Sequence, residues 1–377
     1  MMQTMAFFNA LEEHINKKLP FVAYRKPSET VLKAFLQKDL HSYKTTNFSE
    51  SGFVLSNFIG TQSLLIPEEH SEIITSEYKI NASIDEPSKY ISKINTTTEQ
   101  EKHEKLVAKA IAEIESGSMK KVVLARKEKI DIKLSALSIF KNLLENYPKA
   151  FCYIWSHPES GIWIGATPET LVKVERNRFK TMALAGTQAY KGILEEATWT
   201  PKEVEEQKIV SEEIVQKLTD FNVTSGEIKF SNPYTVKAGN LLHIRTDISG
   251  ILKDENLANL IESLHPTPAV CGFPREQAKN FIIENEYTDR EFYSGFLGEI
   301  NVKQEVKRNL NRRNQENQAY ASIRKQSDIF VNLRCMKLEE GKAELFIGGG
   351  ITADSNPTAE WEETVNKSYT IKSVLVK

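Results

Sequence analysis

Charged side chains and a glycine run come together near the end of the 377-residue sequence. Arg334 interrupts an apolar, strand-like stretch, and the triplet Gly348–Gly350 ends the next one. Glu360, Glu363 and Lys367 follow at i, i+3 and i+7, so a helix would place them on one face. Carboxylates, cations and exposed backbone N–H groups suit a metal ion with an anionic substrate. This stretch is therefore a candidate enzyme site, although Glu363 and Lys367 also have the spacing of an ordinary surface ion pair.

Two residues farther upstream are candidates for proton transfer. Lys121 begins a strand-like stretch and would face the same way as Val123 and Ala125. A lysine removed from water loses enough basicity to act as a general base near neutral pH, whereas a lysine at the end of a strand often reaches solvent. Glu169 follows a proline between two strand-like stretches. Burial there would raise its pKa and make it a general acid; the alternative is a turn glutamate in solvent.

Two further segments carry groups that suit a ligand. A strand-like stretch ends in Gly186 and Thr187, where the glycine would let a ligand approach the backbone and the hydroxyl could bind it. An ordinary turn would have the same sequence. Glu203 and Glu206 begin a predicted helix and offer hard oxygen ligands for Mg²⁺. Helical periodicity does not choose between them, and acidic residues at a helix start also simply stabilise the helix dipole.

Composition limits the classes of function. The 49 basic and 51 acidic residues give a formal net charge of −2, which offers no case for nucleic acid or an anionic membrane as partner. Cys152, Cys271 and Cys335 lie in apolar stretches without metal-ligand or disulfide spacing. No apolar run approaches the roughly 18 residues that a membrane-spanning helix needs, and the N-terminus does not have the pattern of a signal peptide. We expect a cytoplasmic protein, and a monomer.

The order of predicted elements indicates the fold class. Strands joined by tight turns, with helices in separate blocks, favour an α+β fold with antiparallel sheets over a doubly wound parallel sheet. We expect a strand over Lys120–Ile132, a helix over Ser135–Glu145 capped by Ser135, and a strand over Ile329–Lys337 that pairs with Ala343–Ile347. The polar residues 302–326 predict a long mobile loop or a solvated helix rather than a nucleic-acid surface.

Nine motifs occur in one order from Lys120 to the C-terminus: K-V-V-L-A-R, G-A-T-P-E, L-A-G-T, E-E-Q-K-I-V, L-H-P-T-P-A-V-C-G-F-P, D-R-E-F-Y-S-G, N-L-R-C-M-K, G-G-G-I and E-W-E-E-T-V-N-K. Together they resemble the chorismate-utilising enzymes, which include isochorismate, salicylate and anthranilate synthases. The resemblance implies a single large domain of two packed antiparallel sheets surrounded by helices. Residues 1–98 would be a divergent N-terminal part of this fold, 99–377 its catalytic region, and 302–326 an insertion.

The resemblance also implies roles for particular residues. Glu206 and Glu363 would bind Mg²⁺, with Glu360 close by, and the metal would hold the ring carboxylate of chorismate. The expected substrate-binding residues are Gly186, Thr187, His243, Ala269, Tyr293, Arg334, Gly348 and Lys367. Arg334, Lys367 and the Gly348 backbone would bind carboxylates, and Gly186, Thr187 and Ala269 would line the ring.

Two positions indicate the reaction that the resemblance implies. Lys121 stands where isochorismate and salicylate synthases carry a lysine base, and Ala185 stands where aminodeoxychorismate synthases carry a nucleophilic lysine. The expected reaction is that of an isochorismate synthase: water attacks C2 of chorismate with Lys121 as base, while Glu169 as acid releases the C4 hydroxyl. This requires a lowered pKa for Lys121 and a raised pKa for Glu169. The alternative is a salicylate synthase, which uses similar residues and then eliminates pyruvate.

Overall fold

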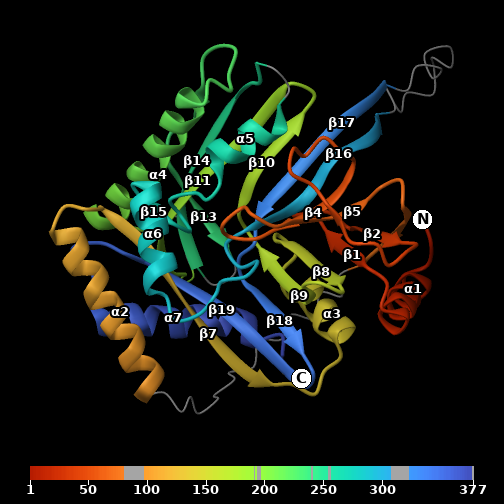
Figure 1. The fold of residues 1–377 in the computed structure, drawn as a ribbon, viewed down its shortest axis with the longest axis horizontal. Helices are drawn as coiled ribbons and strands as arrows, with labels where there is room; N and C mark the ends of the chain where they lie inside the picture. The colour runs from red at the N-terminus through yellow and green to blue at the C-terminus, as the bar shows by residue number, and fades with distance from the viewer. Residues whose placement is uncertain are drawn as a thin grey trace.

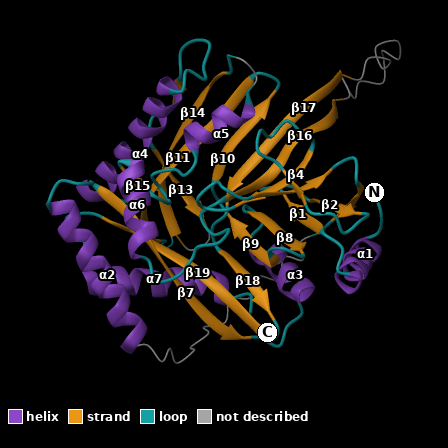
Figure 2. Cartoon of the chain, viewed as in Figure 1, coloured by secondary structure: helices purple, strands orange, loops and turns teal. Residues whose placement is uncertain are grey.

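The computed structural model describes residues 1–79, 97–190, 192, 197–238, 241–253, 256–306 and 322–375. Two large sheets, in which all strand pairings are antiparallel, form its centre (Figures 1 and 2). Sheet A contains, in order, β15 (Gly272–Phe273), β7 (Lys121–Asp131), β19 (Lys342–Ile351), β18 (Cys335–Glu339), β9 (Gly161–Thr167), β8 (Phe151–His157), β1 (Phe21–Arg25), β2 (Val31–Gln37) and β6 (Ser71–Glu77). Sheet B contains, in order, β12 (Lys229–Phe230), β14 (Leu241–Ile251), β11 (Arg178–Ala189), β10 (Thr170–Glu175), β17 (Ser322–Val331), β16 (Phe296–Val306), β4 (Gly52–Ser56), β5 (Ser63–Pro67) and β3 (Tyr43–Lys44); β13 (Tyr234–Ala238) pairs with β14.

Helices cover the outer faces of both sheets. They are α1 (Thr4–Lys17), α2 (Thr97–Glu115), α3 (Ala136–Asn146), α4 (Pro201–Asp220), α5 (Leu257–Leu264), α6 (Arg275–Asn285) and α7 (Pro357–Lys372). Apolar side chains of α1, α3 and the end of α7 pack on sheet A, those of α4 and α5 pack on sheet B, and those of α2 and α6 pack around β7. Figure 1 shows α2, α4, α6 and α7 at the left of the molecule and α1 at the right. The α+β prediction, with antiparallel sheets surrounded by helices, is confirmed.

The inner faces of the two sheets share an aromatic core. Trp155 and Trp163 of sheet A and Phe330 of sheet B are fully buried in it. The rings of Phe151 and Phe330, one from each sheet, stack with centroids 4.1 Å apart. Because this core and the outer helices bury both faces of the central strands, β8 is buried at six of its seven positions and shows little alternation.

Local sequence signals account for several element boundaries. The side chain of Ser135 accepts a hydrogen bond from the Ser138 backbone N–H at the start of α3, so the predicted cap is confirmed. Gly341 adopts φ +70° in the turn between β18 and β19, a conformation that glycine adopts without strain. The predicted hairpin across this turn is confirmed.

The prediction of one continuous strand over Ile329–Lys337 is wrong, because the strand is interrupted in its middle. Strand β17 ends at Val331 in sheet B, and β18 begins at Cys335 in sheet A, so residues 332–334 carry the chain from one sheet to the other. Arg334 adopts φ +49°, which ends the extended conformation. The Asn332 side chain holds this crossing, because it accepts a hydrogen bond from the Tyr153 hydroxyl and donates one to the Phe292 carbonyl. The sequence reads as one strand because the residues on both sides of the crossing are buried.

The prediction for residues 302–326 is wrong at both ends of the segment. Residues 302–306 continue β16 and residues 322–326 belong to β17, with Val302 opposite Gln326 and Lys303 opposite Lys325. The backbone ladder forms between these strands although most of their side chains are polar. Residues 307–321 lie outside the described residues.

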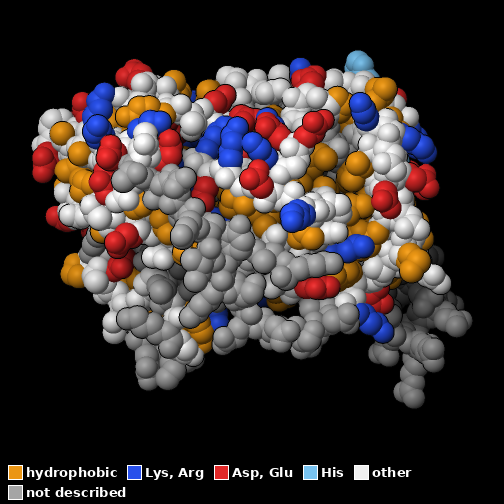
Figure 3. Space-filling model, turned by 90° about the horizontal axis from the view of Figure 1, so that it is seen from below, with side chains coloured by type: hydrophobic (Ala, Val, Ile, Leu, Met, Phe, Trp, Pro, Cys, Tyr) orange, Lys and Arg blue, Asp and Glu red, His pale blue; other side chains and the backbone are white. Residues whose placement is uncertain are grey.

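The N-terminal residues contribute strands to both sheets. Strands β1, β2 and β6 extend sheet A beside β8, and β3, β4 and β5 extend sheet B beside β16. None of the described helices is both long and apolar enough to cross a membrane. On the face drawn in Figure 3, described acidic and basic side chains are interspersed with one another and with hydrophobic ones.

Candidate active site

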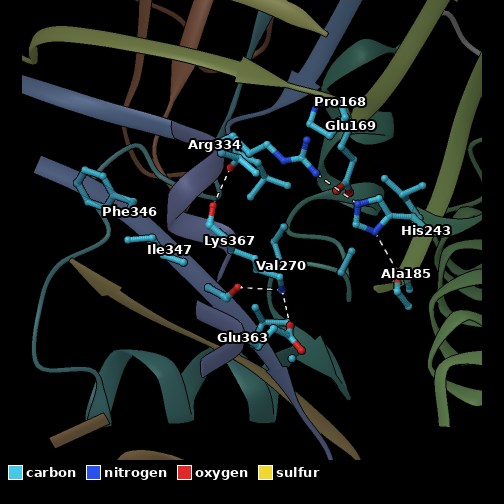
Figure 4. A pocket seen from close by; sticks show the side chains of 18 of the residues that line it. Pro168, Glu169, Ala185, His243, Val270, Arg334, Phe346, Ile347, Glu363 and Lys367 are labelled. Atoms are coloured by element: carbon cyan, nitrogen blue, oxygen red, sulfur yellow. Dashed lines mark hydrogen bonds and ion pairs between the residues drawn. The ribbon is translucent and has the colours of Figure 1, made fainter. Parts of the chain in front are cut away.

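A cavity of about 190 Å³ lies where β7 and β19 of sheet A approach β11 and β14 of sheet B, and α4 and α7 contribute side chains to its wall. Ten of the residues predicted for the site line it: Glu169, Gly186, Glu206, His243, Ala269, Tyr293, Arg334, Gly348, Glu363 and Lys367. In Figure 4, Glu169, Arg334 and His243 gather at one end of the cavity, and Glu363 and Lys367 lie together away from them. Segments that are far apart in the sequence therefore meet here.

Lys121 is buried at the start of β7, with 1% of its side chain exposed. Its Nζ lies 2.8 Å from Oε1 of Glu206, which lines the cavity. Gly350 allows this approach, because a Cβ there would lie 3.3 Å from both Glu206 Oε1 and Lys121 Cε. The alternative of a solvent-exposed lysine is excluded. Lys121 itself contacts the cavity through Glu206 rather than lining it.

Glu203 and Glu206, between which helical periodicity did not choose and of which the family resemblance favours Glu206, have different surroundings. Glu203 lies in the first turn of α4, and its Oε2 accepts a hydrogen bond of 2.7 Å from the Thr200 backbone N–H. This capping box uses its carboxylate to hold the start of the helix. Glu206 lies one turn later and points at Lys121. Both residues line the cavity, but the Glu203 carboxylate holds the helix cap, whereas the Glu206 carboxylate pairs with Lys121.

Glu169 is buried in the turn between β9 and β10, with 4% of its surface exposed. Burial raises the pKa of its carboxyl to about 7, and the positive charges of Lys121 and Arg334 only partly oppose this effect. The Glu169 carbonyl accepts a hydrogen bond of 3.0 Å from the Val331 N–H, which fixes the turn against β17. The alternative of a solvated turn glutamate is excluded, and at neutral pH a large fraction of this carboxyl carries a proton.

His243 connects Arg334 to Gly186. Its Nε2 lies 3.3 Å from Arg334 Nη2, and its Nδ1 lies 2.9 Å from the Gly186 carbonyl oxygen. A guanidinium only donates and a carbonyl only accepts, so these partners require a neutral ring with the proton on Nδ1. Burial and the neighbouring Arg334 lower the pKa of His243 to about 3, which keeps the ring neutral. Gly186 adopts φ +69° at an irregularity of the β11–β14 ladder, which turns its carbonyl toward His243.

Lys367 and Glu363 form an ion pair on the helix face predicted for them. Lys367 Nζ lies 2.6 Å from Glu363 Oε1 and donates to the Gly348 carbonyl at 3.2 Å. Burial disfavours the charge of Lys367, but the Glu363 carboxylate raises its pKa above the usual value. The Tyr293 hydroxyl lies so close to Gly348 that a Cβ there would be 2.6 Å from it. A glycine at this position is therefore required by the packing of Tyr293.

Two predicted residues stand apart from the cavity lining, and the side chain of a third is not described. Lys121 reaches it through Glu206, as described above. Glu360 is buried on α7 next to the glycine triplet, and its Oε1 accepts a hydrogen bond of 2.6 Å from the Ser355 hydroxyl. Thr187 lies in β11, but its side chain lies outside the described residues.

Several lining residues were not predicted. Most are apolar: Val123, Leu184, Val270, Leu333, Phe346 and Ile347. Val123 could have been found, since strand periodicity places it on the same face as Lys121. The others have no chemistry-bearing side chain that would distinguish them from core residues.

The acidic residues near the cavity suit a hard divalent cation by their chemistry. Glu206 and Glu363 line the same cavity, and each already has an ammonium group within 2.8 Å. In the described part of the chain, no three acidic, histidine or cysteine side chains lie close enough to enclose an ion by themselves. Mg²⁺ usually takes only one or two protein carboxylates and fills its other positions with water or substrate. The donors present therefore fit Mg²⁺ bound together with an anionic substrate.

The sequence of this chain is similar to those of known chorismate-binding enzymes. Two profiles of the chorismate-binding enzyme family match residues 23–307 and 318–373. The chain is 28% identical over 325 residues to the isochorismate synthase EntC of Escherichia coli strain K12, covering 83% of this chain and 77% of that protein. It is 30% identical to the isochorismate synthase MenF of Haemophilus influenzae, covering 72% and 60%.

Solved structures share the fold. The menaquinone-specific isochorismate synthase MenF of Escherichia coli superposes with a TM-score of 0.73 at 20% identity, covering 95% of this chain and 89% of that chain. Anthranilate synthase component I of Streptococcus pneumoniae superposes with a TM-score of 0.62 at 17% identity, covering 93% and 92%. The family profiles together span most of the chain, including the strands and helices that build the cavity. The chain therefore belongs to the family of chorismate-binding enzymes.

Proposed function

We propose that this protein is an isochorismate synthase, which converts chorismate to isochorismate. The observation that carries the proposal is a buried acid, Glu169, that has a pKa raised to about 7 and lines the same cavity as Glu206, the partner of Lys121. An acid and a base in one enclosed site are what the exchange of a ring hydroxyl requires. The names of the curated relatives EntC and MenF support the same reaction.

Lys121 acts as the base in this proposal. Water attacks C2 of the chorismate ring, and the Lys121 amine takes one of its protons as the new C–O bond forms. The ring double bonds shift, and the C4–O bond breaks. For Lys121 to act in this way its amine must be unprotonated when water attacks. A proton must therefore first leave the Lys121–Glu206 pair.

Glu169 acts as the acid that releases the C4 hydroxyl. Its raised pKa keeps a large fraction of the carboxyl protonated at neutral pH, so it donates a proton to the departing oxygen, which leaves as water. The proton taken by Lys121 and the proton given by Glu169 balance over the reaction. Chorismate and isochorismate are isomers, so the reaction needs no oxidant or reductant.

Arg334 and Lys367 bind the carboxylates of the substrate. Both side chains line the cavity, and both are positively charged at neutral pH. His243 holds the Arg334 guanidinium by accepting a hydrogen bond, which leaves the remaining N–H donors of Arg334 for the substrate. A Mg²⁺ ion held by Glu206 and Glu363, with Glu360 close by, would neutralise the ring carboxylate.

The proposal is tested by incubating the purified protein with chorismate, with and without Mg²⁺, and separating the products by chromatography. We expect isochorismate, formed only when Mg²⁺ is present. Salicylate with pyruvate would overturn the proposal in favour of the salicylate synthase reaction. Unchanged chorismate in the presence of Mg²⁺ would show that the chain does not catalyse this chemistry. Turnover that persists after complete chelation of divalent metal would overturn the metal assignment alone.

A further inference from the structure

Beside the proposed reaction centre, the edge of β7 that faces away from β19 is only partly covered by a neighbouring strand. Strand β7 pairs with β19 along its length, but its other edge pairs with β15 only at Lys121 and Val122. The last backbone hydrogen bond from that side runs from the Val123 N–H to the Cys271 carbonyl, at 2.8 Å. In the described residues no further strand pairs with this edge. The buried backbone groups that follow on β7 therefore need other partners.

The side chains of Glu286 and Arg290 provide these partners. Arg290 Nη2 donates to the Val123 carbonyl at 2.6 Å, and Glu286 Oε1 accepts from the Ala125 N–H at 2.7 Å. The two side chains also pair with each other, with Arg290 Nε 2.8 Å from Glu286 Oε2, and each is only 3% exposed. The ion pair thus occupies the place of the missing strand and makes the donor and acceptor contacts that a strand would make.

Arg290 also contacts two other parts of the cavity wall, one through its guanidinium and one through its backbone carbonyl. Arg290 Nη1 donates to the Val270 carbonyl at 2.9 Å, and the Arg290 carbonyl accepts from the Tyr293 N–H at 2.9 Å. Val123, Val270 and Tyr293 all line the cavity, whereas neither Glu286 nor Arg290 does. The Arg290 guanidinium therefore joins two wall segments, at Val123 and at Val270, and the Arg290 backbone contacts the third at Tyr293.

We infer that the Glu286–Arg290 pair is a positioning device for the proposed reaction, because it fixes β7 and with it the place of Lys121 relative to the substrate. Lys121 lies two residues before Val123 on the same face of the strand. Arg334 and Lys367 are carried by the crossing between the sheets and by α7, so the pair does not hold the groups that bind the substrate carboxylates. The inference rests on the proposed function of Lys121.

The position of the Glu286–Arg290 pair beside β7 allows an effect on catalysis to be distinguished from an effect on stability. If the pair only stabilises the fold, its loss lowers the folded fraction, and the kcat of the folded enzyme is unchanged. If it positions β7, its loss moves Lys121 away from the attacking water while chorismate still binds. A misplacement of about 1 Å costs on the order of 10²-fold in rate.

The test compares Arg290→Lys with Lys26→Met. The first variant keeps a positive charge beside Glu286, but an ammonium lacks the planar fork with which Arg290 contacts Glu286 and the Val123 and Val270 carbonyls at once. The second breaks another buried cluster, in which Lys26 pairs with Glu299 and Asp328 away from the cavity. For each variant we would measure kcat and KM for chorismate, the free energy of unfolding in urea, and hydrogen exchange of the peptide covering residues 121–126.

For Arg290→Lys we expect kcat to fall about 10²-fold, KM to change little, and the peptide to exchange faster than in the wild type. Lys26→Met should lose stability and keep the wild-type kcat. A wild-type kcat in Arg290→Lys would overturn the inference, because charge alone would then suffice. An equal fall of kcat in the two variants at equal loss of stability would also overturn it.

Hydrogen exchange keeps the inference testable if the proposed function fails. If the wild-type protein does not convert chorismate, faster exchange of residues 121–126 in Arg290→Lys, with unchanged exchange in Lys26→Met, still supports the fixing of β7. Unchanged exchange in both variants would overturn it.

Discussion

Replacing Glu169 by glutamine should change how the stability of the protein depends on pH. The carboxyl has an ordinary pKa of 4.5 and a pKa of about 7 in the folded protein, chiefly because of burial. A raised carboxyl pKa means that the folded state favours the protonated form. The resulting stability is fully present below the unfolded pKa and is lost as pH rises through the folded one. Glutamine has the same shape and does not titrate, so the variant should not show this loss.

The size of the effect follows from the two pKa values. Each pKa unit corresponds to about 1.4 kcal/mol, so a difference of about 2.5 units gives a change of about 3 kcal/mol. The wild type and Glu169→Gln should therefore have similar free energies of unfolding near pH 4. The variant should become more stable than the wild type by about 3 kcal/mol near pH 8. At the same time the variant should not turn over chorismate, because an amide does not supply the proton.

Urea unfolding followed by tryptophan fluorescence is a suitable assay, since Trp155 and Trp163 are fully buried in the inner core. Titrations at several pH values give the difference between variant and wild type. Glu12→Gln, at an exposed position of α1, is the matched control and should follow the wild type. A difference between Glu169→Gln and wild type that stays constant over this pH range would refute the reasoning about burial.

Three further perturbations test other parts of the site. Lys121→Gln should lower kcat by about 10²–10⁴-fold, as expected for loss of a general base, while calorimetry still detects chorismate binding; turnover near the wild-type rate would contradict the assignment. Arg334→Lys should raise KM by about tenfold or more, because a charge-assisted contact contributes roughly 1.5–3 kcal/mol and the His243 contact is also lost; an unchanged KM would count against it. Gly348→Ala should destabilise the fold by about 1–3 kcal/mol, because its Cβ would lie 2.6 Å from the Tyr293 hydroxyl. Adding Tyr293→Phe should recover much of that loss in urea unfolding, and a strictly additive double variant would rule out the clash.

Local signals in the sequence predicted many elements and the face on which a residue lies. The alternation over Lys120–Ile132 gave the strand that is now β7, and Ser135 marked the start of α3. The face shared by Glu360, Glu363 and Lys367 was also predictable from spacing alone. These features depend on residues that are close in the sequence, so local sequence patterns are enough to predict them.

Features that depend on distant partners were not predictable from local patterns, and only the family resemblance indicated that the site residues come together. Nothing in the residues around Asn332 signals that the chain crosses between sheets, because the break is held by Tyr153 and Phe292. Likewise, helical periodicity did not choose Glu206 over Glu203, which the resemblance did, because the difference depends on the cap at Thr200 and on Lys121, which is 85 residues from Glu206. The pairing of Arg290 with the edge of β7 spans 167 residues.

The strand order of sheet A has a consequence for how the protein is made. Strands β18 and β19, near the C-terminus, lie between β7 and β9, which are synthesised much earlier. Until the ribosome has released residues 335–351, β7 and β9 have no neighbours on their facing edges, and unpaired strand edges promote aggregation. The sheet therefore closes only after residues 335–351 have emerged. Nascent chains that stall before this point should depend on chaperones, and the finished enzyme should fold slowly for its size.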